Sequence, residues 1–206
     1  MNSKENKDIE ELIQEVAEKH FLQKGYSMAN TLEIAKEVGC NQALIHYYYR
    51  SKEKLFLKIF ENKARSFFKS ILMAGNECDT FEESIKQKIE AHFDFLTENP
   101  NLPFLVINEL ITNPKRMESI KSDLVHLPQQ IFENLGKDLE KEIEKGNVRQ
   151  IEAIDLVLMI ASLNISLFLA KPILQGVLSM SDDEYNMLLK RRKAENVRII
   201  LSSLLP

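Results

Sequence analysis

Apolar residues recur at helical spacing along almost the whole chain. In the stretch Ile9–Phe21 they lie three and four positions apart, which places them on one face of an α-helix. Glycines and prolines fall mostly between such runs. The pattern predicts an all-α fold of about nine helices and no strand. The expected helices are Ile9–Phe21, Asn30–Val38, Asn41–Tyr48, Leu55–Leu72, Ile85–Leu96, Phe104–Thr112, Ile131–Ile143, Ile151–Ala170 and Asp182–Leu204.

Start and stop signals flank these runs. Asn30, Thr80 and Ser181 each precede a glutamate by three residues, the spacing of a helix-capping box. Ser51 is a further cap, before the long run that ends near Gly75. Stops or starts are expected at Gly25, Gly39, Gly75, Pro100, Pro103, Pro114, Gly146, Pro172 and Gly176.

The composition agrees with this fold class. The chain has 206 residues, enough for one large domain or two small ones with a hydrophobic core. Six glycines and six prolines are roughly half of average usage and too few for an all-β fold. Hydrophobic residues make up 44% and charged residues 28%, which is typical of a soluble globular chain and excludes a disordered one.

Cysteine and histidine usage predicts no metal site and no cofactor. Cys40 and Cys78 make no zinc pattern, and the histidines lack ligand spacing. We expect Cys40, which follows Gly39, to be a buried and inert thiol rather than a redox sensor. The charged start of the chain does not resemble a secretory signal, so we expect a reduced, cytoplasmic setting.

One uncharged stretch raises the question of a membrane. Leu156–Ala170 spans 15 residues, short of the roughly 18–20 that cross a bilayer, and it contains Asn164 between two serines. A helix that is apolar all round and does not span a membrane is buried in protein. We therefore expect a subunit interface here and no membrane partner, with a transmembrane helix as the alternative.

Two short helices near the N-terminus predict DNA binding. The runs that end at Val38 and Tyr48 are separated by Gly39 and few other residues, as in a helix-turn-helix. Between Lys19 and Lys58 there are seven lysines or arginines and three glutamates, a net charge of +4. The whole chain carries −4, so the remainder carries −8. This asymmetry is expected when only one end of a protein meets phosphate.

The same segment resembles the N-terminal signature of the TetR (tetracycline repressor-like) family of bacterial regulators. The matching residues, in order, are Gly25-Tyr26, Ile34-Ala35, Gly39, the aromatic run that ends Tyr48-Tyr49, and Ser51-Lys52-Glu53-Lys54-Leu55. The resemblance implies a DNA-binding domain at residues 1–50 and a ligand-binding and dimerisation domain at residues 51–206. It further implies that the last two long helices pair with those of a second subunit.

The resemblance also implies roles for single residues. The second short helix would enter the major groove, with polar side chains at base edges and others at phosphates or thymine methyls. Tyr49 is expected in the core. Predicted DNA contacts are Asn30, Thr31, Asn41, Gln42, Ala43, Leu44, His46, Tyr47, Tyr48 and Lys52. His46 stands where the family usually has Tyr, and Ala29-Asn30 where Thr is common, so the operator sequence is not inherited from the resemblance.

The central and C-terminal helices would supply two further sites. If the resemblance holds, the central helices enclose a pocket for a bulky, largely apolar ligand, although an apolar face is ordinarily core. Predicted pocket residues are Phe67, His92, Phe93, Phe104, Ile107, Asn108, Ile111, His126, Gln130 and Phe132. Predicted dimer contacts are Leu156, Ile160, Leu163, Asn164, Leu167, Leu189, Ile200 and Leu204. Asn164 is either a polar specificity device between subunits or a hydrogen-bonded residue within one subunit.

These expectations converge on a homodimeric transcription regulator, a repressor that binds a palindromic double-stranded DNA operator and is released by a small effector. Two alternatives are a helical adaptor that works through protein contacts and an enzyme built on a helical bundle. The enzyme is disfavoured because the sequence offers no nucleophile–base pair, phosphate-binding loop or metal-ligand spacing.

Overall fold

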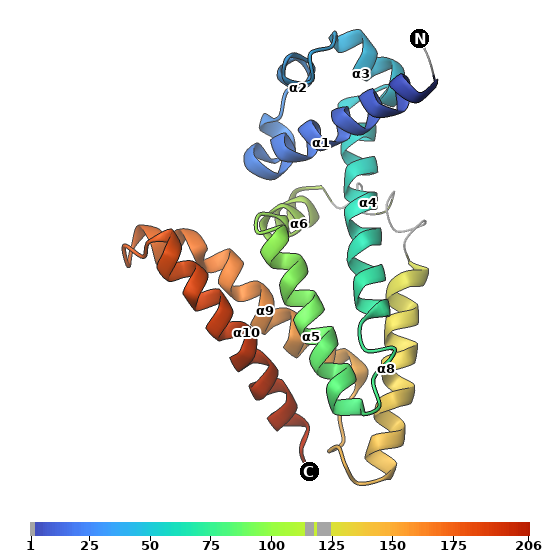
Figure 1. Ribbon diagram of the computed structural model, residues 1–206, viewed down its shortest axis with the longest axis vertical. Coiled ribbons are helices and arrows are strands. Elements are labelled where there is room, and N and C mark those ends of the chain that lie inside the picture. The colour runs from blue at the N-terminus through green and yellow to red at the C-terminus, as the bar shows by residue number, and fades with distance from the viewer. Residues whose placement is uncertain (1–2, 114–117, 119–124) are drawn as a thin grey trace. The chain divides into compact units, whose positions relative to one another are not determined.

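The computed structural model of the protein describes residues 3–113, 118 and 125–206, and this part of the chain forms nine α-helices and no strand (Figure 1). The predicted all-α fold is confirmed. The helices are α1 Ser3–Met28, α2 Thr31–Val38, α3 Gln42–Tyr49, α4 Lys52–Met73, α5 Phe81–Glu98, α6 Leu102–Thr112, α8 His126–Glu144, α9 Ala153–Gly176 and α10 Asp182–Leu204.

Side-chain caps fix the starts of several helices. The Ser181 hydroxyl accepts a hydrogen bond from the backbone N–H of Glu184, and the Glu184 carboxylate accepts one from the backbone N–H of Ser181, a complete capping box for α10. At α5 the Thr80 hydroxyl accepts from the backbone N–H of Glu83 at 3.2 Å, whereas the Glu83 carboxylate pairs with Lys86. Local sequence therefore sets where these helices begin.

Most helix ends differ from the prediction by a few residues, and three sites show why. The stop expected at Gly25 is present inside α1, because its φ of 73° and ψ of 169° are not helical, and a short further stretch of helix follows to Met28. α3 begins at Gln42 because Asn41 is its N-cap and accepts a hydrogen bond from the Leu44 N–H at 2.8 Å. α9 continues through Pro172 to Gly176, and Leu174 in this last turn packs against the second core cluster while Ile173 stays exposed. Pro114, a predicted stop, lies outside the described residues.

The chain divides into two compact units. The first comprises residues 1–64 with 105–124, and the second comprises residues 65–104 with 125–206. In the first unit α1, α2, α3 and the start of α4 enclose a small core in which the Phe21 and Phe56 rings meet edge to face at 5.1 Å. Ile13, Ala17, Ile34, Ile45 and Leu55 are almost wholly buried around them. The domain boundary expected between residues 50 and 51 stays a prediction.

In the second unit α9 and α10 lie side by side, and α5 contacts both (Figure 1). One core cluster joins Ile85 and Ile89 of α5 to residues of α8, α9 and α10, including Leu139, Leu156 and Ile200. A second cluster gathers Phe93, Leu96, Phe168, Tyr185 and Leu189. Burial of these side chains is the main force that holds the four helices together.

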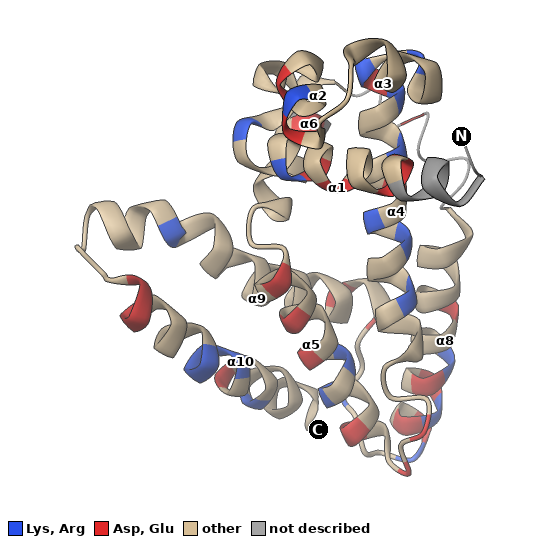
Figure 2. Ribbon diagram, turned by 45° about the horizontal axis from the view of Figure 1, so that its top comes forward, with Lys and Arg blue, Asp and Glu red and all other residues tan. Residues whose placement is uncertain are grey.

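Only one side of α9 is covered by its own chain. Leu156, Asn164 and Phe168 face the core and are buried. Opposite them runs an exposed apolar stripe, which we name the outer face of α9: Ile154, Leu158, Leu169 and Ile173. Figure 2 shows that the helix carries almost no charge. By length and composition alone α9 could cross a membrane. This is weak evidence, because core helices of soluble proteins meet the same criteria.

Candidate nucleic-acid interface and apolar cavity

The turn between α2 and α3 is built around Gly39. Its φ of 80° lies in the left-handed region that favours glycine, and its N–H bonds to the carbonyl of Lys36 at 3.3 Å. The next N–H, from Cys40, bonds to the carbonyl of Ala35 at 2.9 Å. Ile34 and Ile45 are buried on the inner sides of the two helices. The turn and this packing fix α3 against α2, as in a helix-turn-helix.

The outer face of α3 carries the side chains predicted to meet bases. Gln42, Ala43, His46 and Tyr47 are exposed, and their spacing places all four on one side of the helix. Tyr47 is 65% exposed, although it is a large aromatic residue with its ring against that of Tyr48. Leu44 and Tyr48 are half-buried. This face can therefore enter a groove without rearrangement of the core.

A hollow of about 390 Å³ lies where α2, α3 and α4 begin. Five predicted DNA contacts line it, and among them the Gln42 side-chain amide donates to the Thr31 hydroxyl at 2.7 Å. Lys52 approaches it from the start of α4, where its ammonium lies 4.6 Å from the centre of the Tyr26 ring and donates to the Ser27 carbonyl at 3.2 Å. The full lining is Thr31, Gln42, Ala43, Ile45, His46, Ser51 and Lys52. Helix starts and a lysine are the groups that bind phosphate in proteins.

The side chains of Asn30 and Asn41 accept hydrogen bonds from the backbone at the starts of α2 and α3. The side-chain oxygen of Asn30 accepts from the Leu32 N–H at 2.8 Å, and that of Asn41 accepts from the Leu44 N–H at the same distance. The predicted cap at Asn30 is confirmed, the cap at Asn41 was not predicted, and the contacts of both residues with DNA stay predictions.

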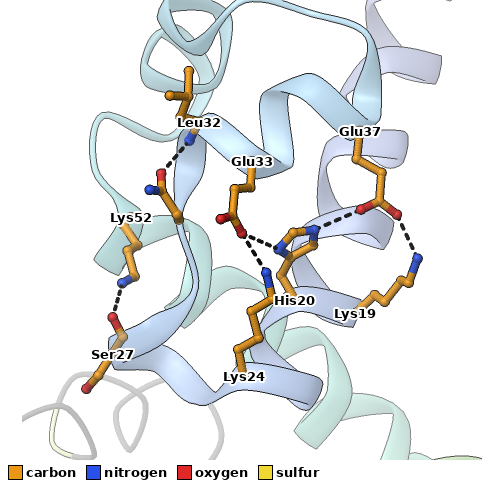
Figure 3. A network of polar contacts seen from close by, with 9 residues as sticks. Lys19, His20, Lys24, Ser27, Leu32, Glu33, Glu37 and Lys52 are labelled. Atoms are coloured by element: carbon orange, nitrogen blue, oxygen red, sulfur yellow. Dashed lines mark hydrogen bonds and ion pairs between the residues drawn. The ribbon is translucent and has the colours of Figure 1, made fainter.

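An ion-pair network that the sequence analysis missed fastens α2 to α1 (Figure 3). His20, which is buried, lies with Nε2 2.9 Å from the Glu37 carboxylate and Nδ1 3.9 Å from that of Glu33. Lys24 pairs with Glu33, and Lys19 pairs with Glu37 at 2.7 Å. Hydrogen bonds from these lysines lower the pKa of each glutamate. The network neutralises the two glutamates of α2, the helix whose first residue, Thr31, lines the hollow beside Lys52.

Two predictions about buried side chains are tested directly. Tyr49 is 7% exposed, and burial raises the pKa of its hydroxyl to about 12, which confirms a core role. Cys40 is only half-buried, so the prediction of a buried thiol is wrong. Burial still raises the pKa of its thiol, which disfavours the nucleophilic thiolate.

An apolar cavity of about 270 Å³ lies within the second unit, between α4, α5, α8 and α9. Phe67, His92 and Phe132, all predicted pocket residues, line it together. The sequence analysis missed the other lining residues, because an apolar helix face does not show whether it meets a neighbour or a void. They are Phe68, Ile71, Ile85, Lys88, Pro128, Ile131, Leu135, Val157, Ile160, Ala161 and Ile165.

The remaining predicted pocket residues do not line this cavity. Phe93 is buried in the second core cluster, where its ring lies 5.6 Å from that of Phe168. Phe104, Ile107 and Asn108 are exposed on α6. His126 and Gln130 are exposed on the first turns of α8, and the side chain of Ile111 lies outside the described residues.

Most predicted dimer contacts lie inside one chain. Residues that face the core of a single subunit are not free to meet a partner unless that core opens. Leu156, Asn164, Leu189, Ile200 and Leu204 are all at most 7% exposed. Ile160, Leu163 and Leu167 are half-buried, and Ile160 lines the cavity. If α9 contacts a second subunit, the outer face of α9 is the surface available for it.

Comparisons with known proteins agree with the geometry. The profile of bacterial regulatory proteins of the tetR family matches residues 13–59, and that of the tetracyclin repressor-like C-terminal domain matches residues 81–200. The fatty acid metabolism regulator protein of Bacillus subtilis is 26% identical over 126 residues, 61% of this chain and 63% of that protein. The transcriptional activator FasR of Mycolicibacterium smegmatis is 20% identical over 129 residues, 62% of this chain and 59% of that protein. The chain thus spans about three fifths of the length of these relatives.

Solved structures share the fold over nearly the whole chain. FadR from Bacillus subtilis, in complex with stearoyl-CoA, has a TM-score of 0.66 at 18% identity and covers 94% of this chain and 98% of its own. HlyIIR, a hemolysin II transcriptional regulator, has a TM-score of 0.61 at 21% identity and covers 98% of this chain and 99% of its own. One profile covers the helix-turn-helix and the other more than half of the sequence. The protein therefore belongs to the TetR family of bacterial transcription regulators.

Proposed function

We propose that this DNA-binding regulator is a homodimeric, cytoplasmic repressor that binds a palindromic operator and is released by a small, largely apolar ligand. The observation that carries the proposal is the outer face of α3, where four exposed side chains stand beside a hollow bordered by Lys52. Each subunit would place one α3 in a major groove, and two subunits would read two half-sites.

The outer face of α9 supports the dimer. Ile154, Leu158 and Ile173 are 43%, 58% and 61% exposed on a helix that carries charge only at Asp155 and Lys171. Contiguous apolar surface of this kind marks protein–protein contact sites. A second copy of the chain would supply a matching α9, because a two-fold interface uses the same patch on both subunits.

The apolar cavity supports a ligand. Its walls are almost entirely aliphatic and aromatic, and cavities of this kind take molecules with a large apolar part. Two similar proteins support a ligand with a large apolar part, since one is a fatty acid metabolism regulator and the structure of FadR holds stearoyl-CoA. Ligand binding would favour a conformation in which the two α3 helices no longer fit successive grooves.

Selection of binding sites from random double-stranded DNA with the purified protein tests the proposal. We expect an inverted repeat whose half-sites lie on one side of the duplex, bound with an affinity that falls steeply with salt. A helical adaptor or an enzyme would enrich no sequence and give no salt-sensitive shift. Either result with pure, folded protein contradicts the proposed operator binding.

A further inference from the structure

A buried chain of hydrogen bonds leads from the apolar cavity to α10. His92 of α5 lines the cavity and is 8% exposed, while Asn164 of α9 and Asn196 of α10 are fully buried. The Asn164 side-chain nitrogen lies 3.0 Å from Nδ1 of His92, and the Asn196 side-chain nitrogen donates to the Asn164 side-chain oxygen at 2.9 Å. Arg192 donates to the side-chain oxygen of Asn196 at 2.8 Å.

The partners of this chain fix the orientation of both amides. The Asn196 nitrogen also donates to the backbone carbonyl of Leu163 at 3.2 Å, and its oxygen accepts from Arg192, which has only donors. The Asn164 nitrogen also donates to the backbone carbonyl of Ile89 at 3.1 Å. If either amide were rotated, an oxygen would face a carbonyl oxygen, so each has one favourable orientation.

These orientations determine the tautomer of His92. An amide nitrogen donates and does not accept, so Nδ1 of His92 is the acceptor of the hydrogen bond from Asn164. In a neutral imidazole the proton is then on Nε2. Among the residues that the structure describes, none accepts a hydrogen bond from this Nε2–H. The ring belongs to the cavity wall and meets Phe67 edge to face at 5.3 Å.

The rest of the cavity wall offers little to a polar group. Lys88 is its other polar residue, and it lies where the cavity meets a separate polar hollow lined by Asn76, Ser84 and Asp138. The Lys88 ammonium donates to the Ser84 hydroxyl on that side, at 2.6 Å. A donor in an otherwise apolar pocket gives specificity, because a ligand that cannot accept its hydrogen bond leaves a buried N–H unsatisfied.

We infer that His92 is the polar anchor of the ligand cavity and that it donates from Nε2 to one oxygen acceptor, such as a ketone or ester carbonyl, on an otherwise apolar ligand. Asn164 is the positioning residue that keeps the proton on Nε2. This assignment rests on the proposed ligand response and names the chemistry of the ligand.

A matched pair of probes tests the anchor. Benzophenone and 1,1-diphenylethylene have the same shape, but only the ketone accepts a hydrogen bond. We expect the wild-type protein to bind the ketone about 3- to 10-fold more tightly, as measured by ligand-observed NMR, and His92→Phe to abolish this preference while its helical circular dichroism stays unchanged. Equal affinities in the wild type, a preference that survives in His92→Phe, or no binding of either probe would overturn the assignment.

The tautomer can be measured without any substitution. Long-range proton–nitrogen NMR spectra of ¹⁵N-histidine-labelled wild type should show His92 protonated at Nε2 alone. Protonation at Nδ1 would overturn the role given to Asn164. In Asn164→Asp a carboxylate would face Nδ1 and draw the proton to it, so the ketone preference should fall in that variant if it folds.

Operator binding is measured in parallel, with DNA chosen by the site selection described above. A lost ketone preference with intact operator binding would contradict only the role of His92. A wild-type protein that gives no salt-sensitive DNA shift would contradict the proposed operator binding, whatever the cavity binds.

Discussion

At the scale of single residues, His92 couples stability to pH. Burial lowers its pKa to about 4, whereas an unfolded histidine titrates near 6.5. Between these values the unfolded chain binds more protons than the folded one, so stability rises with pH across this window. The contribution of neutral His92 is fully present above about pH 6.5 and is lost as pH falls toward 4.

We predict that His92→Phe flattens this pH dependence. The wild type should lose about 3 kcal/mol more than the variant between pH 7 and pH 4. Urea unfolding at intervals across that range measures the difference. The stabilising effect of ionised Glu33 and Glu37, whose pKa values are lowered, begins to be lost as pH falls through their ordinary pKa of 4.5, and it is lost in both proteins alike. Parallel pH profiles for the two proteins would contradict the prediction.

Gly75 is a second residue whose effect on stability depends on tertiary packing. Its φ of 76° is left-handed, and an added Cβ would lie 2.8 Å from the Cα and carbonyl oxygen of Ser84. Gly75→Ala should therefore destabilise the protein by roughly 1–3 kcal/mol, measured by chemical denaturation.

Gly136 provides the matched control. It lies within α8, where no neighbouring atom is within 4 Å of an added Cβ. Gly136→Ala should stabilise by roughly 0.5–1 kcal/mol, because glycine loses more backbone entropy than alanine in a helix. A Gly75→Ala protein at least as stable as the wild type would contradict the crowding against Ser84.

At the scale of elements, α3 and the start of α4 should contribute differently to DNA binding. Gln42 stands on the exposed face of α3, so Gln42→Ala should relax the preference at particular base pairs by about 1–3 kcal/mol. Lys52→Ala should weaken binding to all sequences alike and reduce the salt slope by about 1. Gel shifts at several salt concentrations, with the operator and its single-base variants, separate the two effects. The same pattern from both variants would contradict the assigned roles.

Sequence-based prediction was most accurate for features that lie within single helices and turns. The helix starts at Asn30 and Ser181 and the turn at Gly39 depend on neighbours within four residues, so the sequence contains the whole cause. The exposed face of α3 was predicted for a related reason, because Ile45 and Tyr49 are the residues of that short helix that reach the core. The ion pairs of His20 were missed because they join α1 to α2 across 13 and 17 positions.

At the scale of the whole molecule, the outer face of α9 makes the dimer testable. Leu158→Glu puts a charge in the middle of this exposed stripe without touching the core. We expect a monomer by light scattering at micromolar concentration and loss of binding to the full palindrome. Met73→Glu, at an exposed methionine on α4, is the control and should leave the wild-type mass unchanged. A dimeric Leu158→Glu protein would exclude this face as the interface.

The sequence by itself determined the helices, their caps, the helix-turn-helix and the family, because each depends on residues close along the chain. Tertiary structure alone decided that Leu156 is core while Leu158 is surface, that Phe67 lines a cavity while Phe93 fills a cluster, and that Asn164 bonds within one chain. Helical periodicity fixes the direction of a side chain around its own helix axis. It does not say which directions a distant helix covers, and packing between α5, α8, α9 and α10 supplies that answer.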